Sequence, residues 1–316
     1  MRVAVLDDYQ HVATTMADWT KLPKDVTVTC FTDHQPDASA LGERLKGYEI
    51  VCIMRERTAF TRDVFERLPD LKLLVTTGMR NASVDMQAAA DHGVTVCGTA
   101  GSSTGTPELA FGLILSLARN IPNENAAMRQ GRWQLSIGQG IKGRTLGLLG
   151  LGNLGSRVAH YGKAFDMELI AWSQNLTEEV AAAKGVRRVE KDELFQQSDF
   201  ISVHLVLSPR SRGIVGAREL GLMKPTAYLV NTSRGPIVDE DALAEALRDG
   251  AIAGAGIDTY SVEPIPKTSP FLDLPNTVLT PHLGYVTEET YQIFYEQTVE
   301  NILAWLAGAP VRVITA

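Results

Sequence analysis

The sequence predicts an α/β protein with two doubly wound parallel-sheet domains. Three observations support this prediction. Short apolar runs alternate with helical patterns over roughly the first hundred residues, the alternation begins again near residue 145, and the glycine-rich turn GLGNLG joins a strand to a helix in the second half. Strands that alternate with amphipathic helices are typical of parallel sheets covered by helices.

The first domain starts the alternation at the N-terminus. Its apolar runs predict buried strands at residues 2–8, 26–31, 50–55, 71–78 and 94–99. The segments at residues 41–47, 61–69 and 84–93 predict helices between the later strands. Continuous apolar runs of this length are typical of strands that are buried on both faces.

The second domain follows a long apolar segment after Pro107. Residues 108–130 predict a single helix, which could connect the domains. Strands are then predicted at residues 145–150, 168–173, 200–205, 227–233, 253–260 and 277–283, and helices at 239–250 and 287–308. We expect one domain of residues 1–102 plus 286–316 and another of residues 103–285, with a ligand-binding cleft between them.

Composition excludes several classes of protein. The net charge is −7 without a basic stripe, so no nucleic-acid partner is expected. The sequence shows no signal peptide and no membrane span, and its six scattered histidines indicate no metal site. Cys30, Cys52 and Cys97 lie in apolar strands without a CxxC pair, which predicts buried, reduced thiols and a cytoplasmic location.

The glycine turn predicts a dinucleotide site. Gly150, Gly152 and Gly155 fit the pattern G-x-G-x-x-G between a strand and a helix, with Asn153 and Leu154 at the helix start. In this pattern the glycines permit the tight turn, the approach of a pyrophosphate and close packing of helix on strand. The N–H groups at the helix start then face the phosphates.

The next strand lacks the acid that usually follows such a turn. An Asp or Glu about 20 residues on would bind the ribose hydroxyls of NAD. Here the strand ends at Ser173, followed by Gln174 and Asn175, which are compatible with either cofactor. No arginine stands at this strand end, and the basic residues nearby are Lys184, Arg187 and Arg188. The sequence therefore favours NADP over NAD.

Four charged residues lie where predicted strands of the second domain end. They are Arg234, Asp258, Glu263 and His282. Each alone has an ordinary structural explanation, but ligands of open α/β sheets bind at the ends of the strands. His is a side chain that titrates near neutrality, and Arg is a cation that is not deprotonated.

These motifs resemble the D-isomer-specific 2-hydroxyacid dehydrogenase family, and its glyoxylate/hydroxypyruvate reductases in particular. The matching segments are GLLGLGNLGSRVA, HLVLSPRSRGIV, LMKPTAYLVNTSRGPIVDEDAL, GAGIDTYSVEP and LPNTVLTPHLG, and they extend over most of the chain. The resemblance implies a flavodoxin-like substrate domain and a Rossmann cofactor domain that is inserted into it.

The resemblance also implies roles for individual residues. His282 is expected to be the acid/base, Glu263 its orienting partner and Arg234 the group that holds the keto oxygen and carboxylate. The loop Gly78-Met79-Arg80 resembles the one whose N–H groups bind the carboxylate. The cofactor contacts implied in addition to the glycine turn and the end of its second strand are Thr106, His204, Thr232 and Asp258, the last at the nicotinamide amide.

Three positions depart from the family pattern or have no clear role. Arg80 stands where many members have glycine, so it either adds a charge near the substrate or faces solvent. Arg55 follows a strand with Arg57, and it either contacts a second anionic group or pairs with Glu56. Tyr285 lies just beyond His282 and either closes the substrate pocket or packs at the hinge.

The sequence therefore predicts a homodimeric NAD(P)-dependent oxidoreductase that interconverts a small 2-keto acid and the D-2-hydroxy acid. Two alternatives remain at this stage. One is a nicotinamide-sensing binding protein similar to corepressors that share the fold, and the other is a relative that acts on formate, phosphite or a larger phosphorylated hydroxy acid.

Overall fold

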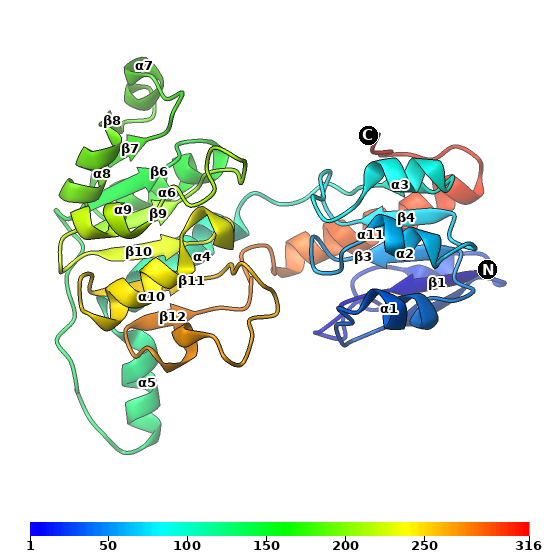
Figure 1. Cartoon of the computed structure of the whole chain (residues 1–316), viewed down its shortest axis with the longest axis horizontal. Helices are drawn as coiled ribbons and strands as arrows, with labels where there is room; N and C mark the ends of the chain where they lie inside the picture. The colour runs from blue at the N-terminus through cyan, green and yellow to red at the C-terminus, as the bar shows by residue number, and fades with distance from the viewer. Residues whose placement is uncertain (316) are drawn as a thin grey trace. The chain divides into compact units, whose positions relative to one another are not determined.

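The structure is a computed structural model that describes residues 1–315. The chain forms two compact units. Unit 1 contains Met1–Ser102 and the segment from Thr287 to the end of the described chain, and unit 2 contains Ser103–Val286. Both units are drawn in Figure 1.

Unit 1 is built on a five-stranded parallel sheet with the order β2-β1-β3-β4-β5. Its strands are β1 (Arg2–Val5), β2 (Thr27–Cys30), β3 (Ile50–Ile53), β4 (Leu73–Thr76) and β5 (Thr95–Cys97). Its helices are η1 (Trp19–Lys21), α1 (Ala38–Arg44), α2 (Arg62–Glu66), α3 (Met86–Asp91) and α11 (Glu288–Leu306). This strand order is flavodoxin-like and reverses between β1 and β3.

The two faces of this sheet are covered by different helices. Figure 1 shows α1, α2 and α3 on one face and α11 on the other. Alternate strand residues such as Val51 and Ile53 pack with Leu41 of α1 and Phe65 of α2 in one buried cluster. Because successive strand residues point to opposite faces, two covered faces require the continuous apolar runs in the sequence.

Unit 2 is built on a seven-stranded parallel sheet with the order β12-β11-β10-β9-β6-β7-β8. Its strands are β6 (Thr145–Leu149), β7 (Glu168–Trp172), β8 (Arg187–Arg188), β9 (Phe200–Val203), β10 (Tyr228–Asn231), β11 (Gly254–Ile257) and β12 (Thr277–Leu279). Its helices are α4 (Gly105–Ala118), α5 (Ile121–Arg129), α6 (Asn153–Ala164), α7 (Glu178–Ala182), α8 (Lys191–Gln197), α9 (Ala217–Leu222), η2 (Gly235–Ile237), α10 (Glu240–Arg248) and η3 (Pro270–Asp273). The order is that of a Rossmann sheet, and it reverses between β6 and β9.

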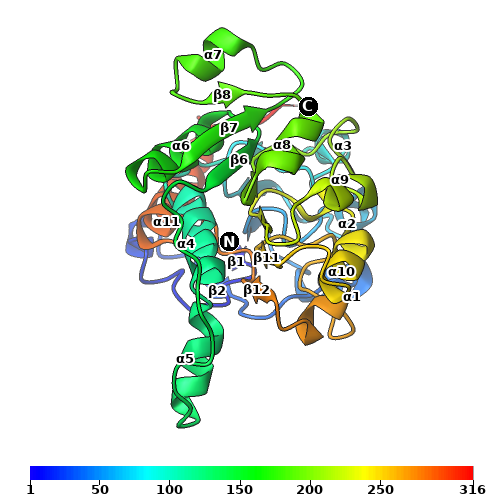
Figure 2. The same cartoon turned by 90° about the vertical axis from the view of Figure 1, so that its left-hand side faces the viewer.

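Helices again cover both faces of the sheet in unit 2. Figure 2 shows α4 and α6 on one face and α8, α9 and α10 on the other. Leu148 and Leu149 of β6 are adjacent in sequence and belong to the two different core clusters, one against each helical layer. Two parallel doubly wound sheets were predicted, and the fold class is confirmed.

One predicted element is wrong. Residues 108–130 were expected to form one helix, but the chain breaks between α4 and α5, where Asn120 has a left-handed φ of 52°. Pro122 explains the break, since its ring would clash with the carbonyl of Ala118 in a continuous helix. Figure 1 shows that α5 then extends away from the sheet of unit 2.

The cysteines differ slightly from the prediction. All three are free thiols, and Cys52 and Cys97 are buried as expected. Cys30 is only half-buried because its strand, β2, lies at the edge of the sheet. Partial burial still raises the pKa of the Cys30 thiol to about 11, mainly through desolvation.

Candidate functional site

The glycine turn connects β6 to α6. Gly150 has a φ of 105°, and a Cβ on Gly155 would lie 2.1 Å from the Gly150 oxygen, so both positions require glycine. A Cβ on Gly152 would meet no atom within 4 Å. The second glycine therefore borders open space, and the N-terminus of α6 has no side-chain cap there. This arrangement fits a pyrophosphate.

The end of β7 lies beside this turn. The Gly150 N–H donates to the Trp172 carbonyl over 2.8 Å. Ser173 after it is half-buried, and Gln174 and Asn175 are exposed. The ribose end of the predicted dinucleotide site therefore presents uncharged side chains at this strand.

Two further residues predicted to line the nicotinamide pocket follow β9 and β10. Desolvation of the His204 ring lowers its pKa to about 4, and its Nε2 bonds to the Ser202 hydroxyl over 2.8 Å. The Thr232 Oγ1 is buried without a hydrogen-bond partner among the described residues. A buried hydroxyl without a partner costs free energy, so Thr232 is suited to bind a polar ligand atom.

The His–Glu pair lies at the ends of β11 and β12. His282 Nδ1 and Glu263 Oε2 are 2.6 Å apart. The other Glu263 oxygen accepts from the Tyr260 N–H over 2.9 Å, which fixes the carboxylate. His282 has a left-handed φ of 54°, and its own N–H donates to the Asp258 carbonyl over 2.8 Å. The ring is thus held from both the side chain and the backbone.

Asp258 fixes the loop that carries His282. Its carboxylate accepts hydrogen bonds from Thr280 Oγ1, Leu283 N and Gly284 N over 2.6, 2.7 and 3.0 Å. Burial raises the Asp258 pKa, although these bonds and the neighbouring His282 oppose the change. In this structure the carboxylate is engaged by the loop, so Asp258 acts first as a positioning residue; its contact with a nicotinamide amide stays a prediction.

Thr106, another predicted cofactor contact, supports the same loop. Its hydroxyl donates to the Gly284 carbonyl over 2.9 Å. The neighbouring Tyr285 packs its ring edge-on against His282, with ring centroids 5.4 Å apart at 72°. Thr106 therefore joins α4 to the His282 loop, and Tyr285 covers one side of the imidazole.

Arg234 follows β10, which pairs with β11 in the set of three adjacent strands that carry the charged residues. Its guanidinium Nη1 donates to the Ser233 carbonyl over 2.8 Å. Asn231 shapes this turn, because its amide donates to the Arg234 carbonyl and its oxygen accepts from Ser233 N. Arg234, Glu263 and His282 thus follow adjacent strands at the carboxyl edge of one sheet, as predicted for ligand-binding groups.

Unit 1 presents a second cationic group at its own switch point. Arg55 follows β3, and its Nη1 donates to the Thr77 carbonyl over 3.2 Å. A Cβ on Gly78 would lie 1.8 Å from this Nη1, so the guanidinium lies against the Gly78 backbone. Arg55 also pairs with Glu56 over 3.6 Å. Arg57 instead stacks on Tyr9 and bonds the Asp7 carbonyl.

The loop after β4 differs in one detail from its predicted role. The Gly78 N–H donates to Thr99 Oγ1 over 2.9 Å, so it is already used within unit 1. Asn81 holds the loop through bonds to the Arg55 carbonyl and the Thr76 hydroxyl. Met79 and Arg80 are exposed, and no hydrogen bond of their N–H groups is found within residues 1–315. Within Gly78-Met79-Arg80, these two N–H groups remain for an anion.

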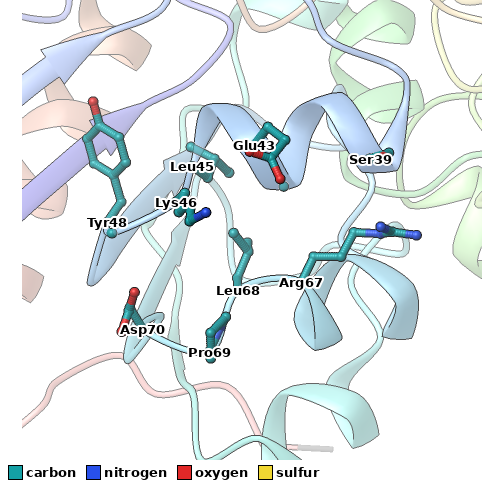
Figure 3. A pocket seen from close by; sticks show the side chains of 11 residues that line it. Ser39, Glu43, Leu45, Lys46, Tyr48, Arg67, Leu68, Pro69 and Asp70 are labelled. Atoms are coloured by element: carbon teal, nitrogen blue, oxygen red, sulfur yellow. The ribbon is translucent and has the colours of Figure 1, made fainter.

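A separate hollow of about 280 Å³ lies elsewhere in unit 1. Figure 3 shows it between α1 and the end of α2, with Glu43, Lys46, Arg67 and Asp70 around it. Tyr48 and Asp70 precede β3 and β4, so this hollow lies at the opposite end of the sheet from Arg55. Acidic and basic side chains both line this hollow, so its charge does not indicate a particular ligand.

Sequence reasoning missed several residues that shape the site. Tyr260 holds Glu263, Thr280 binds Asp258, and Thr99 and Asn81 hold the loop of unit 1. Each of these residues is uncharged. Position at a strand end was the available signal, but the hydrogen-bond partners require coordinates.

The Rossmann strand order and the glycine turn define unit 2 as a dinucleotide-binding domain of the α/β class. Comparison with known proteins identifies the family. Residues 111–284 match the model of the D-isomer specific 2-hydroxyacid dehydrogenase NAD binding domain. The chain belongs to this family.

Several members of the family are similar over most of this chain. Glyoxylate reductase of Korarchaeum cryptofilum is 34% identical over 86% of this chain and 84% of its own length. D-3-phosphoglycerate dehydrogenase of Methanocaldococcus jannaschii is 38% identical over 84% of this chain, which spans only 51% of that relative. The crystal structure of a phosphoglycerate oxidoreductase from Vibrio cholerae superposes with a TM-score of 0.93, at 36% identity, covering 98% of this chain and 100% of that one.

Within the described residues, no helix has both the length and the apolar character that a membrane span needs.

Proposed function

We propose that the protein is an NAD(P)H-dependent oxidoreductase that interconverts a small 2-keto acid and the D-2-hydroxy acid. The observation that carries this proposal is the His282–Glu263 pair, 2.6 Å apart at the carboxyl edge of the Rossmann sheet. Unit 2 is proposed to bind the cofactor and unit 1 to contribute substrate-binding groups.

His282 is the proposed proton donor and acceptor. Reduction adds a hydride to the carbonyl carbon, supplied by the nicotinamide when it is bound, and a proton to the oxygen. Glu263 holds Nδ1, so Nε2 is the nitrogen left to deliver the proton. The carboxylate stabilises the imidazolium before transfer and holds the neutral tautomer with Nδ1–H after it.

Arg234 is proposed to bind the substrate carboxylate and keto oxygen. A guanidinium remains charged throughout the reaction and offers paired donors to a carboxylate. The Met79 and Arg80 N–H groups are proposed to contribute further donors to that carboxylate. The side chains of Arg55 and Arg80 are then available to contact a second anionic group of the substrate.

Glyoxylate and hydroxypyruvate are the proposed substrates. Relatives of similar length include a glyoxylate reductase from Korarchaeum cryptofilum and a glycerate dehydrogenase from Methylorubrum extorquens. The phosphoglycerate dehydrogenase from Methanocaldococcus jannaschii is about twice as long as the matched region, so its activity is a weaker guide. The neutral side chains at the end of β7 favour NADPH over NADH.

The proposal is tested by incubating the purified protein with a panel of 2-keto acids and either NADPH or NADH. Nucleotide oxidation is followed by absorbance, and chiral chromatography identifies the product. The expected result is reduction of glyoxylate, and conversion of hydroxypyruvate to D-glycerate, in the wild type only. A His282→Ala variant that oxidises the nucleotide as fast as the wild type would disprove the assigned proton donor.

We infer in addition that the protein forms a homodimer through the α5 arm, defined as α5 and residues 130–140. This arm exposes several large apolar side chains: Ile121, Met128, Trp133, Leu135 and Ile137. Trp133 is 70% exposed and Ile137 100% exposed. Apolar side chains gathered on one arm are typical of a surface that another protein covers.

The dimer is tested by light scattering on the eluate of a sizing column. The wild type is expected at twice the chain mass, and Trp133→Glu with Ile137→Glu is expected to shift it toward the chain mass. Val206→Glu is the matched control, because Val206 is an exposed apolar residue outside the arm. A wild type that elutes at the chain mass would refute the inference.

A further inference from the structure

Lys184 is fixed at the end of α7 by a closed turn. Its N–H donates to the Ala181 carbonyl, the Gly185 N–H donates to Ala182, and the Val186 N–H donates again to Ala181. Gly185 has a φ of 68°, which lets the chain turn back into β8. Figure 1 shows α7 and β8 beyond β7 at one end of the sheet in unit 2. The backbone of Lys184 is therefore well defined.

The Lys184 side chain reaches the glycine turn. Its Nζ donates to the Leu151 carbonyl over 2.7 Å, across 33 residues of chain. Leu151 stands between Gly150 and Gly152, and the Gly150 N–H bonds to Trp172 at the end of β7. The ammonium therefore lies where the glycine turn meets the end of β7, the corner at which a dinucleotide-binding fold binds the ribose.

The two arginines of β8 are already paired. Arg187 contacts Glu193 and Gln197, and Arg188 contacts Glu190 and the Leu176 carbonyl. Lys184 takes part in no ion pair found among residues 1–315. An ammonium has three donors and one bonds to Leu151, so two remain for the oxygens of an anion.

We propose that Lys184 binds the 2′-phosphate of NADPH and thereby supplies the cofactor discrimination that the uncharged end of β7 leaves open. The inference rests on the proposed use of a nicotinamide dinucleotide. Ser173 would leave space at the ribose without repelling the phosphate, and Lys184 supplies the positive charge. The discriminating group thus comes from the segment after α7, whereas the usual acid stands at the strand end.

The alternative is that Lys184 only ties α7 to the turn. The two roles differ in which nucleotide they affect. A tether would change the binding of NADPH and NADH alike, because both share the pyrophosphate on the same turn. A phosphate ligand would change NADPH alone, and its contribution would fall as salt is raised.

The test is direct binding of NADPH and of NADH, without substrate, to the wild type and to Lys184→Met and Lys184→Arg. Isothermal titration gives the dissociation constants. Lys184→Met is expected to weaken NADPH about tenfold or more and NADH less than about twofold, as for loss of one charge-assisted hydrogen bond. Lys184→Arg is expected to keep most of the NADPH affinity.

Arg187→Met is the matched control, because it removes a cation three residues away that acidic and amide partners already hold. It is expected to change neither constant, and urea unfolding verifies that each variant is folded. Equal weakening of both nucleotides by Lys184→Met, or no weakening, would overturn the inference and leave the proposed function intact. A wild type that binds NADH but not NADPH would also overturn it. A wild type that binds neither would overturn the proposed function itself.

Discussion

Replacing Glu263 with Gln tests how the site holds its histidine. The substitution keeps the shape of the side chain and removes its charge. The Tyr260 N–H already donates to Glu263 Oε1 over 2.9 Å, so in the variant the amide oxygen stays at Tyr260 and the NH₂ group faces His282 Nδ1. This NH₂ group can donate to a neutral ring with an unprotonated Nδ1, but it destabilises the imidazolium that is proposed to donate the proton.

The expected magnitude follows from this contact. The 2.6 Å bond between Glu263 and His282 is a charge-assisted hydrogen bond, whose loss costs about 1.5–3 kcal/mol. If that energy is lost mainly in the protonated state, kcat for keto acid reduction falls roughly 10- to 150-fold. KM for the keto acid should change little, since Arg234 and the unit 1 groups are the proposed ligands of the carboxylate.

The assay is steady-state reduction of hydroxypyruvate at saturating nucleotide. Glu240→Gln serves as the control, because Glu240 binds the Ser261 N–H of the same loop but does not touch the ring. It should keep kcat near the wild-type value. The reasoning is refuted if Glu263→Gln retains more than about a third of kcat, or if only KM rises.

Three further changes have defined outcomes. Asp258→Asn places an NH₂ group against loop donors such as Gly284 N, so we expect a loss of about 1–3 kcal/mol in urea unfolding and a lower kcat; an unchanged kcat would remove its positioning role. The pKa of His204 is about 4 in the folded protein, below its ordinary value of 6.5, so the neutral ring stabilises the fold above pH 6.5 and this stabilisation is lost as the pH falls toward 4. Between pH 7 and 4.5 the free energy of unfolding of the wild type should therefore fall by about 2–3 kcal/mol more than that of His204→Gln. Equal decreases in the two proteins would contradict the burial of this ring. Gly155→Ala should lower the free energy of unfolding by about 1–3 kcal/mol through its clash with the Gly150 carbonyl. Gly152→Ala should change the free energy of unfolding by less than about 1 kcal/mol but weaken nucleotide binding, measured by titration. Equal effects of the two variants in both assays would be inconsistent with the open space at Gly152.

The fold could be predicted because the sheets are buried on both faces. Runs such as residues 50–53 and 146–149 must be free of polar side chains, and they are separated by helical patterns that repeat along the chain. The break at Asn120 was missed because the apolar pattern continues into Pro122, and periodicity alone does not register a proline.

The candidate site was only partly predictable for a related reason. Position at strand ends made Arg234, Glu263 and His282 candidates, since parallel strands place their carboxyl ends at one edge, and their roles came from the family resemblance. It could not show that the Gly78 N–H is used by Thr99, or that the Asp258 carboxylate holds the Leu283 N–H. Those contacts depend on side-chain geometry.

The cofactor question illustrates the same limit. The missing acid after β7 was visible in the sequence, and so were three basic residues nearby. Only the structure distinguishes Lys184, whose ammonium donates to the Leu151 carbonyl, from Arg187 and Arg188, which contact carboxylates.

The most direct test of the account compares the wild type with His282→Gln in the reduction of hydroxypyruvate by NADPH under single-turnover conditions. Gln keeps the polarity of the position but cannot donate an acidic proton. We expect the rate of the chemical step to fall by at least about 100-fold while NADPH binding is retained, as for loss of a general acid. A variant that reduces the keto acid within a few-fold of the wild-type rate would contradict the central role of His282.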